Sequence, residues 1–294
     1  MLTPMDAADA TLWVEDRPAR LLRPAGMSPL VDLEPRDLDD RRLLRELPPE
    51  RRVITWRGRA ESADELGAIL QALSRTPACL YRLELDSPRA GDALFPLQML
   101  RAAGRKDVTA YALGPGGFWT RILAPHLGAP IAIAGDGDSV PSVTQWMEDY
   151  GFPQLGTPEQ IFGIVGCPVL RSLSPRLHNA AYRALGLEAL YLPFPVEGFA
   201  GFWQDVVAGL DGLGWPLGGL TVTSPYKEEA LATAGEASPL ARQAGSANTL
   251  LRRNGSWLAD TADADGVVKA LAHRRVPLAG RKTAVVGCGG AGRV

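Results

Sequence analysis

Residues 218–229 read GGLTVTSPYKEE, and this stretch joins a predicted strand to a predicted helix. The segment 220–223 is typical of a short strand. Pro225 ends it, because proline cannot donate to a strand ladder and sets φ for a turn. A helical run at 228–232 follows. Lys227 therefore stands where a strand meets a helix, at the edge of an α/β sheet where ligands bind.

Lys227 is uncommon in this chain because only four of the 31 basic residues are lysine: Lys106, Lys227, Lys269 and Lys282. The others are arginine, which would be expected here if only a positive charge were needed. Lysine differs from arginine because it can transfer a proton near neutral pH once its environment lowers its pKa. Lys227 is thus a candidate general acid/base. The alternative is a surface lysine at the start of a helix.

Length and composition predict a soluble globular protein with room for two domains: the chain has 294 residues, 46% of them hydrophobic and 22% charged. The net charge of −2 gives no reason to expect nucleic acid or a membrane surface as a partner. Cys79, Cys167 and Cys288 show neither metal spacing nor a disulfide framework, which fits a reducing cytoplasm. No signal peptide, membrane span or metal site is expected.

Strands and helices alternate through the first half of the chain. Apolar runs predict strands at 30–33, 53–56, 80–85, 108–113 and 130–134, and helices are predicted at 63–74, 95–103 and 118–127. Units of this length imply parallel strands joined by crossover helices. Turn residues at 150–153 place a domain boundary between about 150 and 160.

The second half begins with a buried-type strand at 161–166. Further strands are expected at 190–194, 220–223 and 283–286, and helices at 175–185, 199–209 and 265–273. Asn254-Gly255 lies between the segments 248–251 and 256–258, which predicts a hairpin with a type I′ turn.

Two serines two residues apart, Ser172 and Ser174, precede the helix at 175–185, and Ser174 is its expected N-cap. Hydroxyls, free backbone N–H groups and the helix dipole together can bind carboxylate or phosphate oxygens. The alternative is an ordinary cap plus a turn serine. His178, one turn into the helix, is interpreted as structural, and His126 and His273 have no partners at catalytic or metal spacing.

Asn248 and Asp263 are a second polar pair, at a strand start and a helix start. Their amide and carboxylate could hydrogen-bond a polyol, and Asp263 could also orient Lys227. The alternative is a strand-start asparagine and an N-cap aspartate. Further on, Gly287, Gly289 and Gly292 follow a predicted strand in a G-x-G-x-x-G pattern, which is typical of a dinucleotide site.

Taken in order, these stretches resemble shikimate dehydrogenase over about residues 160–294. The family pattern is Ser-x-Ser-Pro-x-x-His-Asn, Asn-Val-Thr-x-Pro-x-Lys, Gly-Ala-x-Asn-Thr, Asn-Thr-Asp-x-x-Gly and Gly-x-Gly-Gly-Ala. The matching stretches are 172–179 (SLSPRLHN), 221–227 (TVTSPYK), 245–249 (GSANT), 261–266 (TADADG) and 287–291 (GCGGA). The chain departs from the pattern at Arg171 (often His), at Thr221 (Asn) and at Thr261-Ala262 (Asn-Thr). The last of these removes an amide near the substrate.

The resemblance implies a role for each matching residue. Ser172 and Ser174 would hold the substrate carboxylate, and Thr223, Asn248 and Asp263 would bind ring hydroxyls. Lys227 would be the general acid/base that protonates the ketone oxygen while NADPH delivers hydride, with Asp263 orienting it. The implied cofactor site is Gly287, Gly289, Gly290, Ala291 and Gly292.

The implied reaction is the reversible NADP-dependent reduction of 3-dehydroshikimate to shikimate, in chorismate and aromatic amino acid biosynthesis. A quinate dehydrogenase and a non-catalytic shikimate-binding or regulatory protein are the alternatives, and the serine pair favours shikimate over quinate. The resemblance also allows a homodimer.

The first half resembles the later part of a type I 3-dehydroquinate dehydratase barrel. Residues 113–121 (LGPGGFWTR) are similar to Met-Gly-x-x-Gly-x-x-Ser-Arg of that family, and residues 128–134 to its Gly-Ser-x-x-Thr-Phe-Ala. The family needs a Schiff-base lysine and a histidine, and the matching positions are Arg82 and Arg57. Because a guanidinium stays protonated and cannot form the imine, dehydratase activity is not expected.

The predicted fold class is α/β, with three parts. Residues 1–155 form a degenerate, partial (β/α) barrel-like domain with a scaffold or interaction role, and residues 156–275 an open α/β substrate-binding domain. Residues 276–294 supply the first strand and glycine loop of a Rossmann domain. We expect this chain to be an incomplete form, with a loosely held segment at 280–294 that binds shikimate weakly and does not bind NADP.

Overall fold

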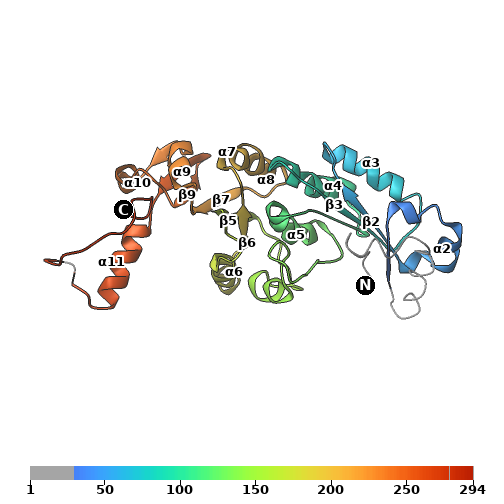
Figure 1. Ribbon diagram of the computed structural model, residues 1–294, viewed down its shortest axis with the longest axis horizontal. Coiled ribbons are helices and arrows are strands. Elements are labelled where there is room, and N and C mark those ends of the chain that lie inside the picture. The colour runs from blue at the N-terminus through green and yellow to red at the C-terminus, as the bar shows by residue number, and fades with distance from the viewer. Residues whose placement is uncertain (1–29, 278, 294) are drawn as a thin grey trace. The chain divides into compact units, whose positions relative to one another are not determined.

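A computed structural model describes residues 30–277 and 279–293, and the chain divides into two compact units with the boundary after Pro141 (Figure 1). Residues 1–29, which the sequence assigns to the first domain, lie outside the described part.

The first unit contains a four-stranded parallel sheet in the order β1-β2-β3-β4. The strands are β1 (Val31–Leu33), β2 (Arg52–Gly58), β3 (Leu80–Leu85) and β4 (Val108–Ala112). Between and after them lie η2 (Pro35–Asp37), α2 (Arg41–Glu46), η3 (Pro49–Arg51), α3 (Ala63–Leu73), η4 (Gly91–Leu94), α4 (Phe95–Ala103), η5 (Pro115–Gly117), α5 (Phe118–Leu123) and η6 (Ala124–Leu127).

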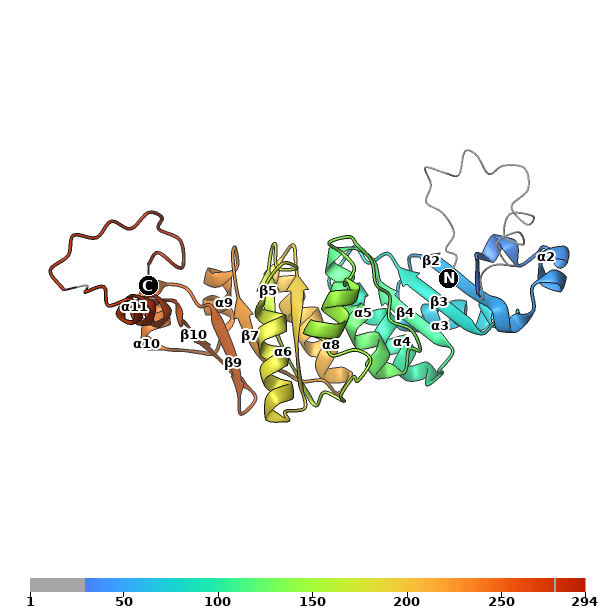
Figure 2. The ribbon, with the colours of Figure 1, turned by 90° about the horizontal axis from the view of Figure 1, so that it is seen from below.

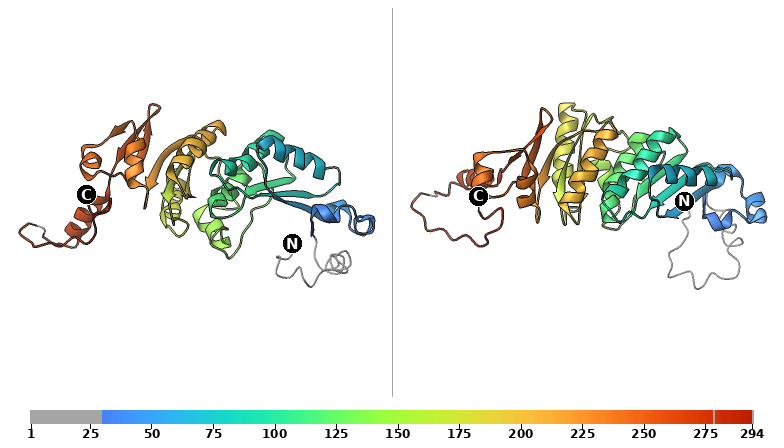
Figure 3. Two further views of the ribbon diagram at one scale, coloured as in Figure 1. Left: turned by 45° about the horizontal axis from the view of Figure 1, so that its top comes forward. Right: turned by 90° about the horizontal axis from the view of Figure 1, so that it is seen from above.

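Helices α3 and α4 lie side by side along the sheet of the first unit (Figure 3). Sequential parallel strands with right-handed crossovers place such helices on one face. Ser62 caps α3 by accepting a hydrogen bond from the Glu65 N–H, and the helix buries Leu66, Leu70 and Leu73. The order and direction of the strands agree with the predicted parallel α/β unit, while the partial barrel remains a proposal.

The register of the first sheet gathers polar side chains on one face. Thr55 pairs with Arg82, and Arg82 pairs with Thr109, so the three lie in one row, and Glu84 pairs with Tyr111 two residues on. All five are buried. Because side chains alternate along a strand, the intervening apolar residues lie on the opposite face.

The predicted strand at 130–134 is wrong, because these residues are irregular and partly or fully exposed. The sheet of the first unit ends at β4, and no strand in the described residues pairs with the segment. An apolar run becomes a strand only where a neighbouring strand satisfies its backbone groups.

The second unit contains a six-stranded mixed sheet in the order β6-β5-β7-β9-β10-β8. Figure 2 labels β5, β7, β9 and β10 of this sheet. The strands are β5 (Gln160–Gly166), β6 (Ala189–Pro195), β7 (Leu217–Val222), β8 (Glu236–Ala237), β9 (Thr249–Arg253) and β10 (Ser256–Asp260). The helices are η7 (Gln145–Asp149), α6 (Ser174–Leu185), α7 (Phe199–Gly201), η8 (Phe202–Val206), α8 (Val207–Gly212), α9 (Lys227–Thr233), α10 (Pro239–Ala244) and α11 (Asp263–His273).

The hairpin of β9 and β10 turns at Asn254 and Gly255, as predicted. Their φ values are 49° and 81°, and a type I′ turn needs positive φ at both positions. The pairing of Arg253 with Ser256 closes the hairpin directly around the two residues.

Three details of the second unit differ from the sequence-based expectations. Ser174 is the first helical residue of α6 and Leu173 is its N-cap, so the predicted serine cap is wrong. No strand forms at 283–286, where Val286 is fully exposed. Residues 142–155, assigned by sequence to the first domain, belong to the second unit, where Asp149 of η7 accepts a 2.7 Å hydrogen bond from Arg176.

Candidate active site

Strand direction brings four loops of the second unit to one edge of its sheet. Strands β5 and β7 are parallel, so the residues after their carboxyl ends lie at the same edge. Strand β9 runs antiparallel to β7 and β10 antiparallel to β9. The start of β9 and the end of β10 therefore reach that edge too, and all six predicted substrate-site residues, Ser172, Ser174, Thr223, Lys227, Asn248 and Asp263, lie in these loops or at the adjoining helix starts.

Three of these residues are in direct contact. The Lys227 Nζ lies 2.6 Å from Asp263 Oδ2, and the Asn248 amide donates to the other carboxylate oxygen, Oδ1, at 2.6 Å. The Lys227 side chain is 18% exposed and that of Asp263 is 29% exposed, so water still reaches the pair. The side-chain oxygen of Asn248, Oδ1, accepts from the Thr249 hydroxyl and from the Ala262 N–H, which fixes the orientation of the amide.

The serine pair is a separate group. Ser172 Oγ donates to Ser174 Oγ at 3.1 Å and accepts from the Ser174 N–H at 3.2 Å. In the second contact the backbone N–H of Ser174, at the start of α6, donates to the Ser172 hydroxyl, so this hydrogen bond holds the loop in a turn. No direct hydrogen bond joins this pair to Lys227 in the described part of the chain.

Thr223 follows β7 and depends on Gly166 at the end of β5. A Cβ added at Gly166 would lie 2.4 Å from Thr223 Cγ2 and 2.9 Å from the Ser224 carbonyl oxygen. The absence of a side chain at Gly166 therefore lets the two strand ends come together, and the Thr223 N–H donates to the Val165 carbonyl. Thr223 is half-buried and makes no hydrogen bond to Lys227, Asn248 or Asp263 in the described residues.

The predicted cofactor residues 287–292 lie beside the lysine group. Ser246 Oγ donates to the Gly290 carbonyl at 3.1 Å, and a Cβ added at Gly290 would lie 3.1 Å from Lys227 Cδ. A dinucleotide fingerprint needs a strand before it and a helix after it. Residues 279–293 form neither, so the arrangement seen here does not fit the pyrophosphate of NADP.

The two arginines that match the dehydratase catalytic positions lie in an ionic cluster of the first unit. Arg82 is 5% exposed and pairs with Asp32 and, at 3.2 Å, with Glu84. Arg57 pairs with Glu84 at 2.6 Å, and the Tyr111 hydroxyl donates to Glu84 at 2.5 Å. Arg82 is thus held by two carboxylates at the place where that family needs a lysine amine.

The two carboxylates of this cluster have pKa values shifted in opposite directions: that of Asp32 is raised and that of Glu84 is lowered. Burial raises the pKa of Asp32 to about 6, against the opposing effects of Arg82 and the Thr55 hydrogen bond. Burial also acts to raise the pKa of Glu84, but the Tyr111 hydrogen bond and the guanidiniums of Arg82 and Arg57 outweigh it, so that pKa is lowered. The difference follows from the number of donors each carboxylate receives.

Sequence reasoning missed two sets of residues. Asp32 and Glu84 lie within apolar strands, and a charged residue at such a position was the available signal. Tyr191 on β6 was interpreted only as part of a strand, yet its hydroxyl donates to Thr221 Oγ1 at 2.8 Å, close to the serine pair. A tyrosine among apolar strand residues carries no sequence signal that separates a core role from a site role.

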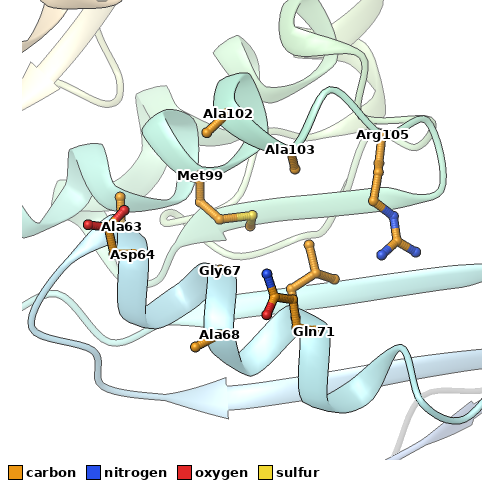
Figure 4. Close-up of a pocket in the computed structure, with 10 residues that line it drawn as sticks. Ala63, Asp64, Gly67, Ala68, Gln71, Met99, Ala102, Ala103 and Arg105 are labelled. Atoms are coloured by element: carbon orange, nitrogen blue, oxygen red, sulfur yellow. The ribbon is translucent and has the colours of Figure 1, made fainter.

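A hollow of about 440 Å³ lies between α3 and α4 in the first unit (Figure 4). Its lining includes Asp64, Gln71, Met99 and Arg105. None of the predicted site residues belongs to the lining, so the hollow plays no part in the candidate site.

Among the described residues, no helix combines the length and the apolar character that crossing a membrane requires.

Part of the second unit is similar to known proteins. Residues 164–250 match the family model of the shikimate dehydrogenase substrate binding domain. The NADP-dependent shikimate dehydrogenase of Symbiobacterium thermophilum is 40% identical over 136 residues, which is 46% of this chain and 45% of that protein. The bifunctional 3-dehydroquinate dehydratase/shikimate dehydrogenase of Arabidopsis thaliana is 26% identical over 79% of this chain and 41% of that protein.

A solved structure of the Thermus thermophilus shikimate 5-dehydrogenase, in complex with NADP(H) and shikimate, is 35% identical over 46% of this chain and 49% of that one, with a TM-score of 0.39. The chain spans less than half the length of the two curated relatives. The sequence match covers the strands and loops that carry Ser172, Ser174, Thr223, Lys227 and Asn248. This chain therefore carries a shikimate dehydrogenase substrate-binding domain at residues 164–250.

Proposed function

We propose that the second unit binds shikimate or 3-dehydroshikimate and supplies the acid/base group of a shikimate dehydrogenase. Lys227 holds the proton that the substrate oxygen takes up when the ketone is reduced, and Asp263 keeps the ammonium in place. Ser172 and Ser174 bind the carboxylate, and Thr223, Asn248 and Asp263 bind the ring hydroxyls. The reaction that this group serves in similar proteins is the NADP-dependent reduction of 3-dehydroshikimate.

The contact of Lys227 with Asp263 at 2.6 Å supports this proposal more than any other observation. A lysine that only carried a surface charge would not need a carboxylate that is itself oriented by an amide. Asn248 donates to that carboxylate at 2.6 Å, so the ammonium lies in a defined position at the sheet edge. Such positioning is what a general acid requires, because proton transfer depends first on geometry.

A shikimate-binding protein without turnover is the second candidate. It is favoured by the shape of residues 279–293, which form no strand or helix to hold a dinucleotide. With residues 279–293 in this arrangement, we propose no hydride step for this chain.

The test combines calorimetric titration of the purified chain with shikimate, separate titration with NADP, and an assay of shikimate oxidation. We expect shikimate to bind. Where turnover is measurable, Lys227→Met should lower its rate by roughly 10²–10⁴-fold, as expected for loss of a general acid/base, and should change the shikimate Kd far less.

Lys269→Met is the matched control, because Lys269 is 78% exposed and pairs with Asp265 one helical turn away on α11. It should change neither binding nor rate. An equal loss of rate and of shikimate affinity in Lys227→Met would show that Lys227 contributes only a positive charge for binding. Binding without any turnover would favour the second candidate, and absence of shikimate binding would contradict both.

A further inference from the structure

Tyr191 on β6 is held on several sides by helix α6. The His178 ring stacks on the Tyr191 ring, with centroids 4.2 Å apart and planes 5° from parallel. The buried Asn179 side chain donates to the Tyr191 carbonyl at 2.9 Å and accepts from the Tyr191 N–H at 2.7 Å. Ile164 and Val169 pack in the same cluster, and Tyr191 is only 3% exposed. These contacts hold the Tyr191 ring in place.

The fixed phenol connects two parts of the candidate site. Its hydroxyl donates to Thr221 Oγ1 at 2.8 Å, and Ser174 lies close enough to the phenol to act on its pKa, which it lowers. Ser174 accepts a hydrogen bond from Ser172, so the hydroxyl of Tyr191 lies between the serine pair and Thr221 of β7. Thr221 is half-buried on β7, which is the second strand from β6 in the sheet.

A threonine hydroxyl differs from an amide at this position. An asparagine amide at position 221, as in the family pattern that the stretch 221–227 resembles, would have N–H donors fixed by its planar group. A threonine hydroxyl rotates freely and can donate only one proton. Because Tyr191 donates to the Thr221 oxygen, the Thr221 proton must point elsewhere and remains available as a donor.

We propose that Tyr191 is a positioning residue that keeps the hydroxyl of Thr221 directed at the carboxylate of the bound substrate. The proposal rests on the proposed function and assigns Tyr191 no direct chemistry. Its role is to replace, by a hydrogen bond, the rigidity that an amide at position 221 would have supplied. His178 and Asn179 act one step further away by holding the tyrosine.

The protonation state of Tyr191 suits a permanent donor. Burial raises the pKa of Tyr191 to about 12, so the phenol keeps its proton throughout the neutral range. The groups that face it are His178 and Tyr182 from α6, Thr221 from β7 and Ser174 at the start of α6. None of these carries a negative charge near neutral pH that would draw the proton away.

The test uses the full chain and two ligands, shikimate and its methyl ester, in which the carboxylate charge is removed. Tyr191→Phe keeps the ring and its stack on His178 but deletes the donor. We expect shikimate affinity to fall roughly tenfold, as for loss of an oriented hydrogen bond to a charged group. The affinity for the ester should change much less. A general structural defect would weaken both ligands alike.

Tyr182→Phe is the matched control, because Tyr182 packs in the same cluster and its hydroxyl makes no hydrogen bond in the described residues. It should leave both affinities unchanged. Thr221→Val should also lower the affinity for shikimate more than the affinity for the ester. The double variant Thr221→Val with Tyr191→Phe should show no further loss of shikimate affinity. Thr221→Asn placed in the Tyr191→Phe background should restore shikimate binding, because the amide supplies its own fixed donors.

The outcomes separate the two proposals. If the wild-type chain binds neither ligand, the proposed function fails and the positioning role fails with it. If the wild type binds shikimate but Tyr191→Phe loses nothing, or loses the acid and the ester equally, only the role of Tyr191 is overturned. Should Tyr191→Phe lose its circular dichroism signal, Thr221→Val decides the question by the same acid-against-ester comparison.

Discussion

At the scale of single residues, Asp32 is the most constrained ionisable group of the first unit. It is fully buried on β1, accepts a hydrogen bond from Thr55 and pairs with Arg82. Loss of hydration disfavours its charged form more than these contacts favour it, so its pKa rises to about 6. An ordinary unfolded aspartate titrates about two pH units lower. The ionised state of Asp32 therefore costs stability near neutral pH.

The pH dependence of unfolding should show this cost. Between about pH 4 and pH 6 the folded state binds the Asp32 proton more tightly than the unfolded state, so stability rises as the pH falls through 6. We expect the free energy of unfolding of the wild type, relative to Asp32→Asn, to increase by about 1 kcal/mol from pH 7 to pH 5.

Urea titrations at both pH values measure this change, and hydrogen exchange in peptides covering β1 to β3 locates it. The Asp32→Asn reference cancels the pH dependence that the rest of the chain contributes equally to both variants. A difference that stays constant between pH 7 and pH 5 would show that Asp32 keeps an ordinary pKa.

At the scale of elements, glycine has opposite effects in a turn and in a helix. Gly255 in the hairpin of β9 and β10 has a φ of 81°, where a side chain is strained. Gly67 lies inside α3, and a Cβ added there would meet nothing within 4 Å. The turn therefore requires glycine at position 255, whereas glycine at position 67 only lowers the stability of the helix.

A matched pair of alanine substitutions tests this contrast. Gly255→Ala should destabilise the chain by about 1 kcal/mol because alanine is forced into the left-handed region. Gly67→Ala should stabilise it by up to about 1 kcal/mol through helix propensity and lower entropy of the unfolded chain. Urea unfolding midpoints measure both, and shifts of the same sign would contradict the structural assignment of one of the two glycines.

At the scale of the whole molecule, the two units divide the chemistry between them. Each has its own sheet and its own buried residues, and every predicted substrate residue lies in the second. The first unit buries charges in a closed network, with Arg82 between Asp32 and Glu84. A guanidinium fixed in this way cannot act as an amine nucleophile.

The chain should therefore form no imine with 3-dehydroquinate. Borohydride reduction in the presence of that compound, followed by mass spectrometry of the intact chain, should show no added mass. An active type I dehydratase treated in parallel is the positive control. An adduct on Lys106, the exposed lysine before β4, would show that the first unit retains the chemistry by another residue.

Much of the element order follows from local sequence. The limits of β3 and α4 agree with the predicted ranges, and α11 begins two residues before the predicted start. An apolar run bounded by turn residues forms a strand where another strand of the sheet pairs with it. The Asn254-Gly255 turn needs only its two residues, because positive φ is a local property. Lys227 and the serine pair were also evident from sequence as polar residues at strand-to-helix junctions.

Only the tertiary structure decided which residues meet. Lys227 and Asp263 lie 36 positions apart and touch because β7, β9 and β10 are adjacent in one sheet. Tyr191 and Thr221 meet for the same reason, through β5 between their strands. The apolar runs at 130–134 and 283–286 did not become strands, because pairing requires a partner that local sequence cannot supply. Residue type and spacing determined the elements and the candidate groups, whereas strand adjacency, a long-range property, determined the contacts that make them a site.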